Sequence, residues 1–215
     1  MVDLSDRGQF LNLSGLFEGG LIVLAFGLGW IFDVNPIEYL TFTWPAVLWG
    51  IAAALPMFGL FVLAHRFAFG PLKQIQRFLI EMLGPSLAAC RWYDLILLAG
   101  LAGLTEEVLF RGMLQMWIER AFDSPTAGLV VASILFGLAH LITPFYAIFA
   151  GVMGLYLGYL LDVSGQRNLL VPVITHAVYD YLAFLVVLRT YHLQQQAQLS
   201  ETASADADND LPPVR

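Results

Sequence analysis

Two carboxylates and a guanidinium lie inside an apolar stretch of the chain, where a charge requires an explanation. The run Thr-Glu-Glu-Val-Leu-Phe-Arg occupies positions 105–111, and each ionisable residue at the centre of a transmembrane helix costs roughly 2.5 to 3.5 kcal/mol on insertion scales. On a helix, Glu107 and Arg111 share a face and can neutralise each other. Glu106 has no such partner in its own helix, and a rotation of about 100° from Glu107 would turn it into a cavity between helices. We therefore expect Glu106 to serve as a general base.

Two later apolar segments each bring a histidine to a similar depth. His140 follows Phe136 by four positions at the end of one segment, and His176 precedes Asp180 by four positions in another. The spacing of His176 and Asp180 allows both to face one site. A single histidine on an apolar face is more often a structural residue, but four such groups together favour chemistry. The sequence therefore predicts that Glu106, His140, His176 and Asp180 share a site.

Other hydrolytic chemistries have sequence signatures that this chain lacks. It contains no His-Glu-x-x-His and no Gly-x-Ser-x-Gly, the signatures of a zinc metalloprotease helix and of a nucleophilic serine. Cys90 is the only cysteine and is remote from the acidic motif in sequence, which excludes an intramolecular disulfide. A water molecule activated by a carboxylate is the remaining nucleophile.

The composition is that of a polytopic membrane protein. Hydrophobic residues make up 59% of the 215 residues and charged residues only 13%, and the mean hydropathy is +0.73. A soluble domain of this size lacks the interior to bury so much apolar surface. Stretches of about spanning length cover residues 15–32, 45–64, 93–118, 126–141, 145–161 and 169–188. We predict an all-α, polytopic transmembrane helical bundle with about six spanning helices.

The segments outside the predicted spans indicate how the bundle sits in the membrane. Residues 66–91 alternate polar and apolar side chains at near-helical spacing, which predicts an interfacial amphipathic helix. Lys and Arg number seven in the N-terminus, the second and fourth loops and the C-terminal segment, against two in the other loops. The positive-inside rule then places both termini of this multi-pass integral membrane protein in the cytoplasm, in the cell membrane if the organism is a bacterium. His65 and His192 flank spans and are expected to be solvated.

The chain is predicted to form one transmembrane domain over residues 1–192, with the motifs within 95–185. The remaining residues, 193–215, are polar and carry several acids with little to bury. We expect a disordered acidic tail there.

Three motifs in order carry a family resemblance: Glu106-Glu107-x-x-x-Arg111, Phe136-x-x-x-His140 and His176-x-x-x-Asp180. Together they resemble the motifs of the CPBP (Abi) family of intramembrane proteases. That family includes the type II CAAX prenyl proteases and bacterial proteins linked to bacteriocin handling. The resemblance covers about residues 95–185 and includes the text Leu-Thr-Glu-Glu-Val-Leu-Phe-Arg-Gly around the first motif.

The resemblance implies an α-helical intramembrane endopeptidase in which Glu106 activates a water molecule. Glu107 and Arg111 would organise the site. The residues that would position the water or stabilise the oxyanion are His140, His176 and Asp180.

By analogy with the family, the need for a metal is open, because members have been described both as metal-dependent and as metal-free glutamic proteases. A divalent metal such as zinc would have His140, His176, Asp180 and Glu106 as its ligands. Prenyl proteases of this family typically carry Asn where this chain has Asp180. An ionised Asp accepts hydrogen bonds or binds a metal but cannot donate to an oxyanion, so Asp180 is either protonated or has a different role.

The main hypothesis is an endopeptidase that hydrolyses a peptide bond of a membrane-associated or prenylated, CAAX-like substrate. Its partners would be that peptide or protein and the lipid bilayer, with no nucleic acid. Two alternatives are a proton-coupled carrier, because buried acids and histidines also form ion relays, and a non-catalytic membrane partner such as an immunity protein. Replacing Glu106 by Gln should abolish the turnover of a protease and leave a scaffold functional.

Overall fold

In the computed structural model, helices are the only regular secondary structure within the described residues, 5–67 and 69–209, with side chains described as far as residue 202. They are α1 (Arg7–Phe32), α2 (Trp44–Arg66), α3 (Gly70–Ala89), α4 (Trp92–Glu107), the π-helical segment η1 (Val108–Gln115), α5 (Met116–Phe122), α6 (Pro125–Ala139), α7 (Pro144–Leu160) and α8 (Leu170–Asn209). The predicted all-α fold class is confirmed for this part of the chain.

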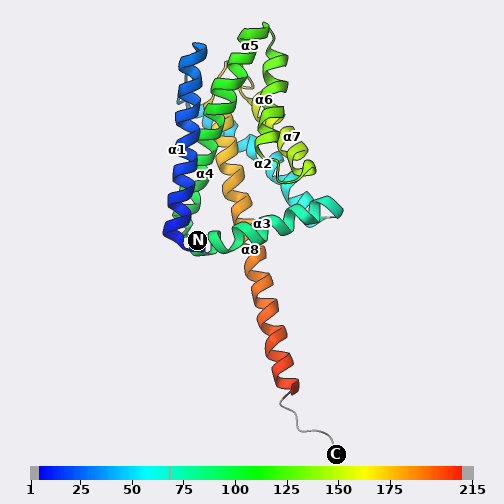
Figure 1. Cartoon of the computed structure of the whole chain (residues 1–215). Coiled ribbons are helices and arrows are strands. Elements are labelled where there is room, and N and C mark those ends of the chain that lie inside the picture. Colours follow the sequence, from blue (N-terminus) through cyan, green and yellow to red (C-terminus); the bar gives the residue numbers. More distant parts are fainter. Residues whose placement is uncertain (1–4, 68, 210–215) are drawn as a thin grey trace, which may run out of the picture.

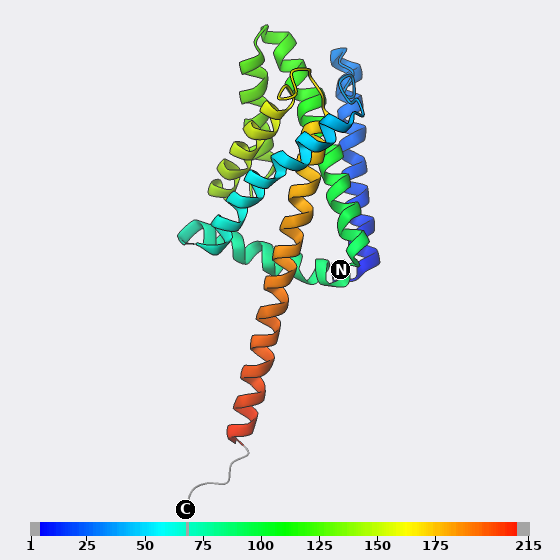
Figure 2. The same cartoon turned by 180° about the vertical axis from the view of Figure 1, so that it is seen from behind.

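The helices form a bundle around α8 (Figures 1 and 2). Helix α1 begins at the end of the bundle where α8 leaves it, and α3 lies across that same end. Two glycines allow α8 to pack closely against its neighbours. A Cβ on Gly50 of α2 would lie 2.6 Å from Ile174 Cβ, and one on Gly103 of α4 would lie 2.7 Å from the backbone nitrogen of Ala177. The close fit fixes α4, which carries the acidic motif, against α8.

Within the described residues, three helices are long and apolar enough to cross a membrane: α1, α2, and α8 over Leu170–Thr202. The apolar helices α6 and α7 are shorter, at 15 and 17 residues. On α1, large apolar side chains spaced seven residues apart face outward at Leu16, Val23 and Trp30, as expected of a surface that contacts lipid. These helices identify an integral membrane protein.

The predicted span 93–118 is part of a longer helical path that continues without a break from Trp92 to Phe122. Its middle, Val108–Gln115, is π-helical. π-Helical segments are rare and occur frequently at functional sites. Here the π-helical segment follows directly after Glu107 and contains Arg111, so the change of helix type falls within the acidic motif.

Helices α2, α6 and α7 begin in the same way. A hydroxyl side chain caps each one, and a proline follows in the first turn, which is a strong start signal for a helix. In α7, Thr143 Oγ1 accepts from the Tyr146 backbone nitrogen at 3.1 Å. Only four residues separate the end of α6 at Ala139 from the start of α7 at Pro144, so α7 turns back against α6 and His140 lies at the turn.

The segments expected outside the spans form two further helices. Residues 66–91, predicted to be an amphipathic helix, contain α3, which is buried through Ile80, Gly84, Ser86 and Leu87. Helix α8 continues to Asn209, whereas residues 193–215 were expected to be disordered; residues 210–215 lie outside the described part. The Gln- and Ala-rich stretch after His192 consists of good helix formers, and it continues a helix that the bundle has already nucleated.

Candidate functional site

Successive residues at the end of α4 face two different helices. Glu106 Oε2 lies 3.7 Å from His140 Nε2 at the end of α6, and Glu107 Oε1 lies 2.8 Å from His176 Nδ1 on α8. The rotation of about 100° per residue along a helix accounts for this divergence. Both histidines are therefore adjacent to the acidic motif, as the sequence predicted, and each contacts a different carboxylate.

Glu107 and Arg111 form a buried ion pair, with exposed side-chain fractions of 0% and 1%. Arg111 Nη1 donates to Glu107 Oε1 at 2.7 Å, and Nη2 donates to the Gly154 carbonyl of α7 at 2.9 Å. The guanidinium also lies over the Phe136 ring, 4.5 Å from its centroid. The predicted pair is present, and it joins the acidic motif to α6, α7 and, through His176, to α8.

The contact between His176 and Glu107 determines which ring nitrogen of His176 carries a proton. Glu107 Oε1 accepts from Arg111 and lies 2.8 Å from His176 Nδ1. A carboxylate paired with a guanidinium only accepts hydrogen bonds, so Nδ1 must be the donor. His176 Nε2 then faces Asp180, whose Oδ2 is 3.6 Å away.

The same reasoning applies to His140. Its Nδ1 lies 2.9 Å from the Phe136 backbone oxygen, and because a carbonyl only accepts, Nδ1 carries the proton. In a neutral ring, Nε2 is then an acceptor that faces Glu106 Oε2, and this oxygen is buried without a hydrogen-bond partner among the described residues. The gap of 3.7 Å is too long for a direct hydrogen bond and is the kind of gap that a water molecule bridges.

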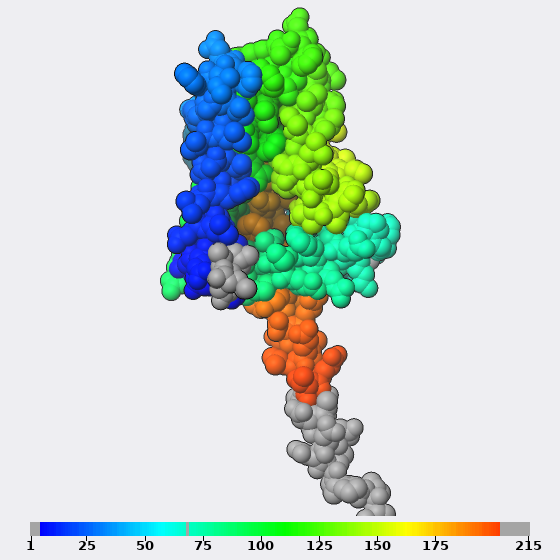
Figure 3. All heavy atoms as spheres, in the orientation of Figure 1, coloured from blue at the N-terminus to red at the C-terminus, as the bar shows by residue number. Residues whose placement is uncertain are grey.

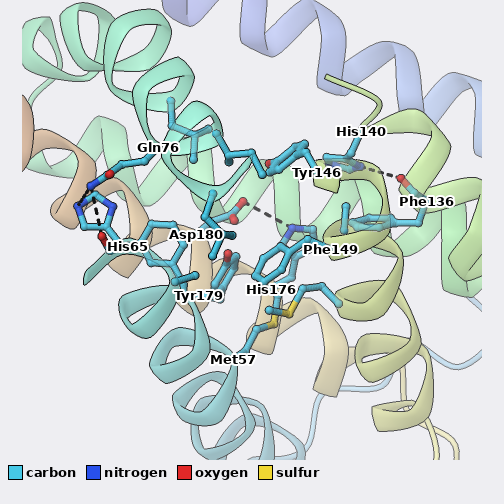
Figure 4. Close-up of a pocket in the computed structure, with 17 residues that line it drawn as sticks. Met57, His65, Gln76, Phe136, His140, Tyr146, Phe149, His176, Tyr179 and Asp180 are labelled. Atoms are coloured by element: carbon cyan, nitrogen blue, oxygen red, sulfur yellow. Dashed lines mark hydrogen bonds and ion pairs between the residues drawn. The ribbon is translucent and has the colours of Figure 1, made fainter. Parts of the chain in front are cut away.

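A cavity of about 110 Å³ is lined by His140, His176 and Asp180. Glu106, which was expected to point into a cavity, is not one of its lining residues and lies next to it through the contact with His140. Figure 4 shows Asp180, His176, His140, Tyr146 and Tyr179 around it, with α3 on the far side. Most of its other lining residues are apolar, so the polar groups occupy one part of a largely apolar wall. In Figure 3, α8 is visible in a hollow above α3 and beside α7.

Sequence reasoning missed several residues around the site. Glu18 of α1 is buried and accepts a hydrogen bond from the Thr105 hydroxyl; a lone acid in an apolar segment was the available signal. Tyr146 and Tyr179 line the cavity without a distinctive sequence pattern. His65, expected to be solvated, lies in the cavity wall and contacts Thr190 and Gln76 through Nε2; His192, as expected, is exposed.

The expected metal ligands do not converge on one point. Within the described ranges, no group of three His, Cys, Asp or Glu side chains is placed to hold a metal ion. The four candidates instead approach one another in two pairs, Glu106 with His140 and His176 with Asp180. The side chains as placed therefore do not fit a metal, and the chemistry below is derived from the protein groups alone.

Comparisons with known proteins identify the segment that carries the site. Residues 88–182 match the family model described as Type II CAAX prenyl endopeptidase Rce1-like. The match covers slightly less than half of the chain and includes all seven residues that the three sequence motifs name. No curated protein and no solved structure matched the chain.

Proposed function

Because residues 88–182 belong to the Rce1-like family of type II CAAX prenyl endopeptidases, we propose that this intramembrane endopeptidase hydrolyses its substrate with a water molecule that Glu106 activates. The observation that supports this most directly is the pair formed by Glu106 Oε2 and His140 Nε2, 3.7 Å apart. Both atoms are acceptors when Glu106 is ionised and His140 is neutral. A water molecule between them would donate one hydrogen to each and keep a lone pair free for attack.

The reaction then follows from the remaining contacts. Glu106 takes a proton from the water as its oxygen attacks the carbonyl carbon of the peptide bond. Asp180, in its carboxylic acid form, donates a hydrogen bond to the oxygen on which negative charge develops. Glu106 returns the proton to the leaving amine. Glu107 and Arg111 keep His176 in place, and His176 Nε2 lies 3.6 Å from Asp180 Oδ2 at the edge of the cavity.

The walls of the cavity favour a substrate that is associated with the membrane. Apolar side chains from α2, α3, α6 and α7 surround the polar groups, and such a surface suits an apolar side chain or part of a lipid chain. We therefore propose a membrane-associated peptide as the substrate, with prenylation near the cleaved bond as the finer hypothesis. We further propose that both termini lie in the cytoplasm, the side on which α3 would cover the cavity.

Cleavage of a mixed library of plain and prenylated peptides by the detergent-purified protein tests the proposal. Glu106→Gln should lower kcat by about a hundredfold or more, the usual contribution of a general base, while the protein stays folded. Glu81→Gln is the matched control, because Glu81 is an exposed acid of α3 that pairs with Arg77. This variant should cleave as the native protein does.

A chelator arm addresses the metal. Cleavage that survives chelation supports water activation by Glu106 alone, whereas loss on chelation with recovery on adding zinc would overturn the metal-free form of the proposal. Full activity of Glu106→Gln would overturn the assignment of the base. The absence of any cleavage by the native protein, across plain and prenylated peptides, would favour the non-catalytic partner or the carrier.

A further inference from the structure

Two polar contacts join α1 to α4, which lie side by side and run in the same direction (Figures 1 and 2). At the start of both helices, Arg7 donates to both carboxylate oxygens of Asp94 at 2.7 Å. Deeper in the bundle, Thr105 donates to Glu18. The two contacts are separated by the same number of residues on each helix: eleven between positions 7 and 18 on α1, and eleven between positions 94 and 105 on α4. Eleven residues are about three helical turns, so the two contacts lie on one seam.

Glu18 is a costly residue for a membrane helix to carry. It is the only acidic residue of α1, its exposed fraction is 9%, and that of its partner Thr105 is 2%. An ionisable residue placed at this depth is expected to have a function, and Glu18 lies outside the segment that matches the family model.

The position of Thr105 explains what this contact can control. Thr105 directly precedes Glu106, so fixing the hydroxyl toward α1 fixes the direction in which the next side chain leaves the helix. Gly103, two residues earlier, packs against the Ala177 backbone of α8. The turn that carries Glu106 is thus held from α1 and from α8. Glu106 Oε2 itself has no hydrogen bond to the described residues that would orient it.

We propose that Glu18 is a positioning residue: by accepting the Thr105 hydrogen bond, it sets the rotation of the α4 turn and thereby the separation of Glu106 from His140. The inference rests on the proposed function. It requires an acceptor at position 18 and a hydroxyl at position 105. The Arg7–Asp94 contact, three turns away, holds the helix ends together without setting this rotation.

The test compares variants that keep the hydrogen bond with variants that remove it. Glu18→Gln and Thr105→Ser keep an acceptor and a donor, whereas Glu18→Leu and Thr105→Val remove them with little change in volume. A misplacement of about 1 Å costs about a hundredfold in rate, so the last two should lose about tenfold to a hundredfold in kcat with KM nearly unchanged. The conservative pair should stay within about threefold of native.

A double-mutant cycle separates a shared action from two independent ones. If Glu18 acts through Thr105, the Glu18→Leu/Thr105→Val variant should be no slower than either single variant. The control is Arg7→Gln, which breaks the outer contact of the same seam and should lower thermal stability but leave kcat unchanged.

Amide hydrogen exchange of the full-length protein in detergent gives a readout that needs no substrate. Exchange over residues 103–107 should accelerate in Glu18→Leu and Thr105→Val and stay native in Glu18→Gln and Thr105→Ser. Unchanged exchange and unchanged kcat in Glu18→Leu and Thr105→Val would overturn the positioning role. If Glu106→Gln is inactive in the same assay, the proposed function still stands. If the native protein cleaves no peptide, exchange alone decides the inference, and native exchange in Glu18→Leu overturns it.

Discussion

The buried Glu107–Arg111 pair allows stability and catalysis to be separated by mutation. Both side chains are almost completely buried, and Arg111 otherwise donates only to the Gly154 carbonyl among the contacts described here. Glu107→Leu therefore leaves a buried guanidinium without its counter-ion. Breaking a buried pair from one side costs about 3–5 kcal/mol, which is roughly a hundredfold or more in the unfolding equilibrium.

The structure also predicts the order of the related variants. Arg111→Met should cost less than Glu107→Leu, because His176 Nδ1 still donates to the remaining carboxylate. The Glu107→Leu/Arg111→Met double variant removes both charges and should recover most of the lost stability, since replacing a buried pair with apolar groups is often neutral. It should remain inactive, because His176 has lost the acceptor that orients it.

Thermal unfolding in detergent measures the three stabilities, and peptide cleavage measures the activities. Reduced unfolding temperatures are expected in the order Glu107→Leu, Arg111→Met, double variant, from lowest to highest. A double variant that is at least as unstable as Glu107→Leu would refute the reasoning, because the cost would then not come from an unpaired charge. A double variant with native kcat would show that His176 needs no orientation by Glu107.

Three further predictions concern the surroundings of the site. Gly137→Ala should lower activity, because the added Cβ would lie 2.5 Å from the Ala147 carbonyl on α7; Gly100→Ala, where the Cβ meets nothing within 4 Å, should be tolerated. The hydrogen bond from Arg120 holds the pKa of Glu38 below its usual value. This stabilisation is present above the unfolded-state pKa and is lost as pH falls through the lower folded-state pKa. The Arg120→Gln variant should therefore lose less stability than the native protein as the pH falls through this range in an acid-unfolding experiment. The difference should be below about 1 kcal/mol, because both side chains are partly exposed. Gln76→Leu removes two hydrogen bonds between α3 and α2 and should accelerate amide exchange in α3; unchanged exchange would contradict a tethering role.

The parts of the site that follow helical spacing were predictable from sequence. Four residues along a helix bring side chains onto one face, and both Glu107–Arg111 and His176–Asp180 meet in this way. Helix α3, which lies within the predicted range 66–91, was predictable for the same reason, because its apolar residues recur with a helical period. The match to the family model supports the motif order that grouped these residues. Their catalytic roles stay predictions.

Contacts between distant segments were not predictable. A single acid at position 18 shows that a partner exists but not that it is Thr105, because no periodicity relates α1 to α4. His65 flanks a span in sequence, yet α3 folds back over it and makes it part of the cavity wall. The π-helical segment and the helical continuation of α8 are likewise decided by packing and by the helix that precedes them, rather than by a local pattern.

The two adjacent acids of the motif differ in what the protein does with them, and this difference carries the functional argument. Glu107 Oε1 accepts hydrogen bonds from a guanidinium and an imidazole. Its Oε2 has no partner among the described residues, but the two bonds to Oε1 pair the charge, so its role is architectural. The Glu106 side chain beside it is 13% exposed, and its buried Oε2 has no hydrogen-bond partner among the described residues. A buried polar atom without a partner is costly in a membrane protein. A water molecule in the gap between Glu106 and His140, which lines the cavity, would supply the missing hydrogen bond. Helical rotation alone gives these adjacent acids different surroundings, so the same substitution should have different effects at the two positions. Glu106→Gln should lower activity only, whereas Glu107→Gln should lower both activity and stability.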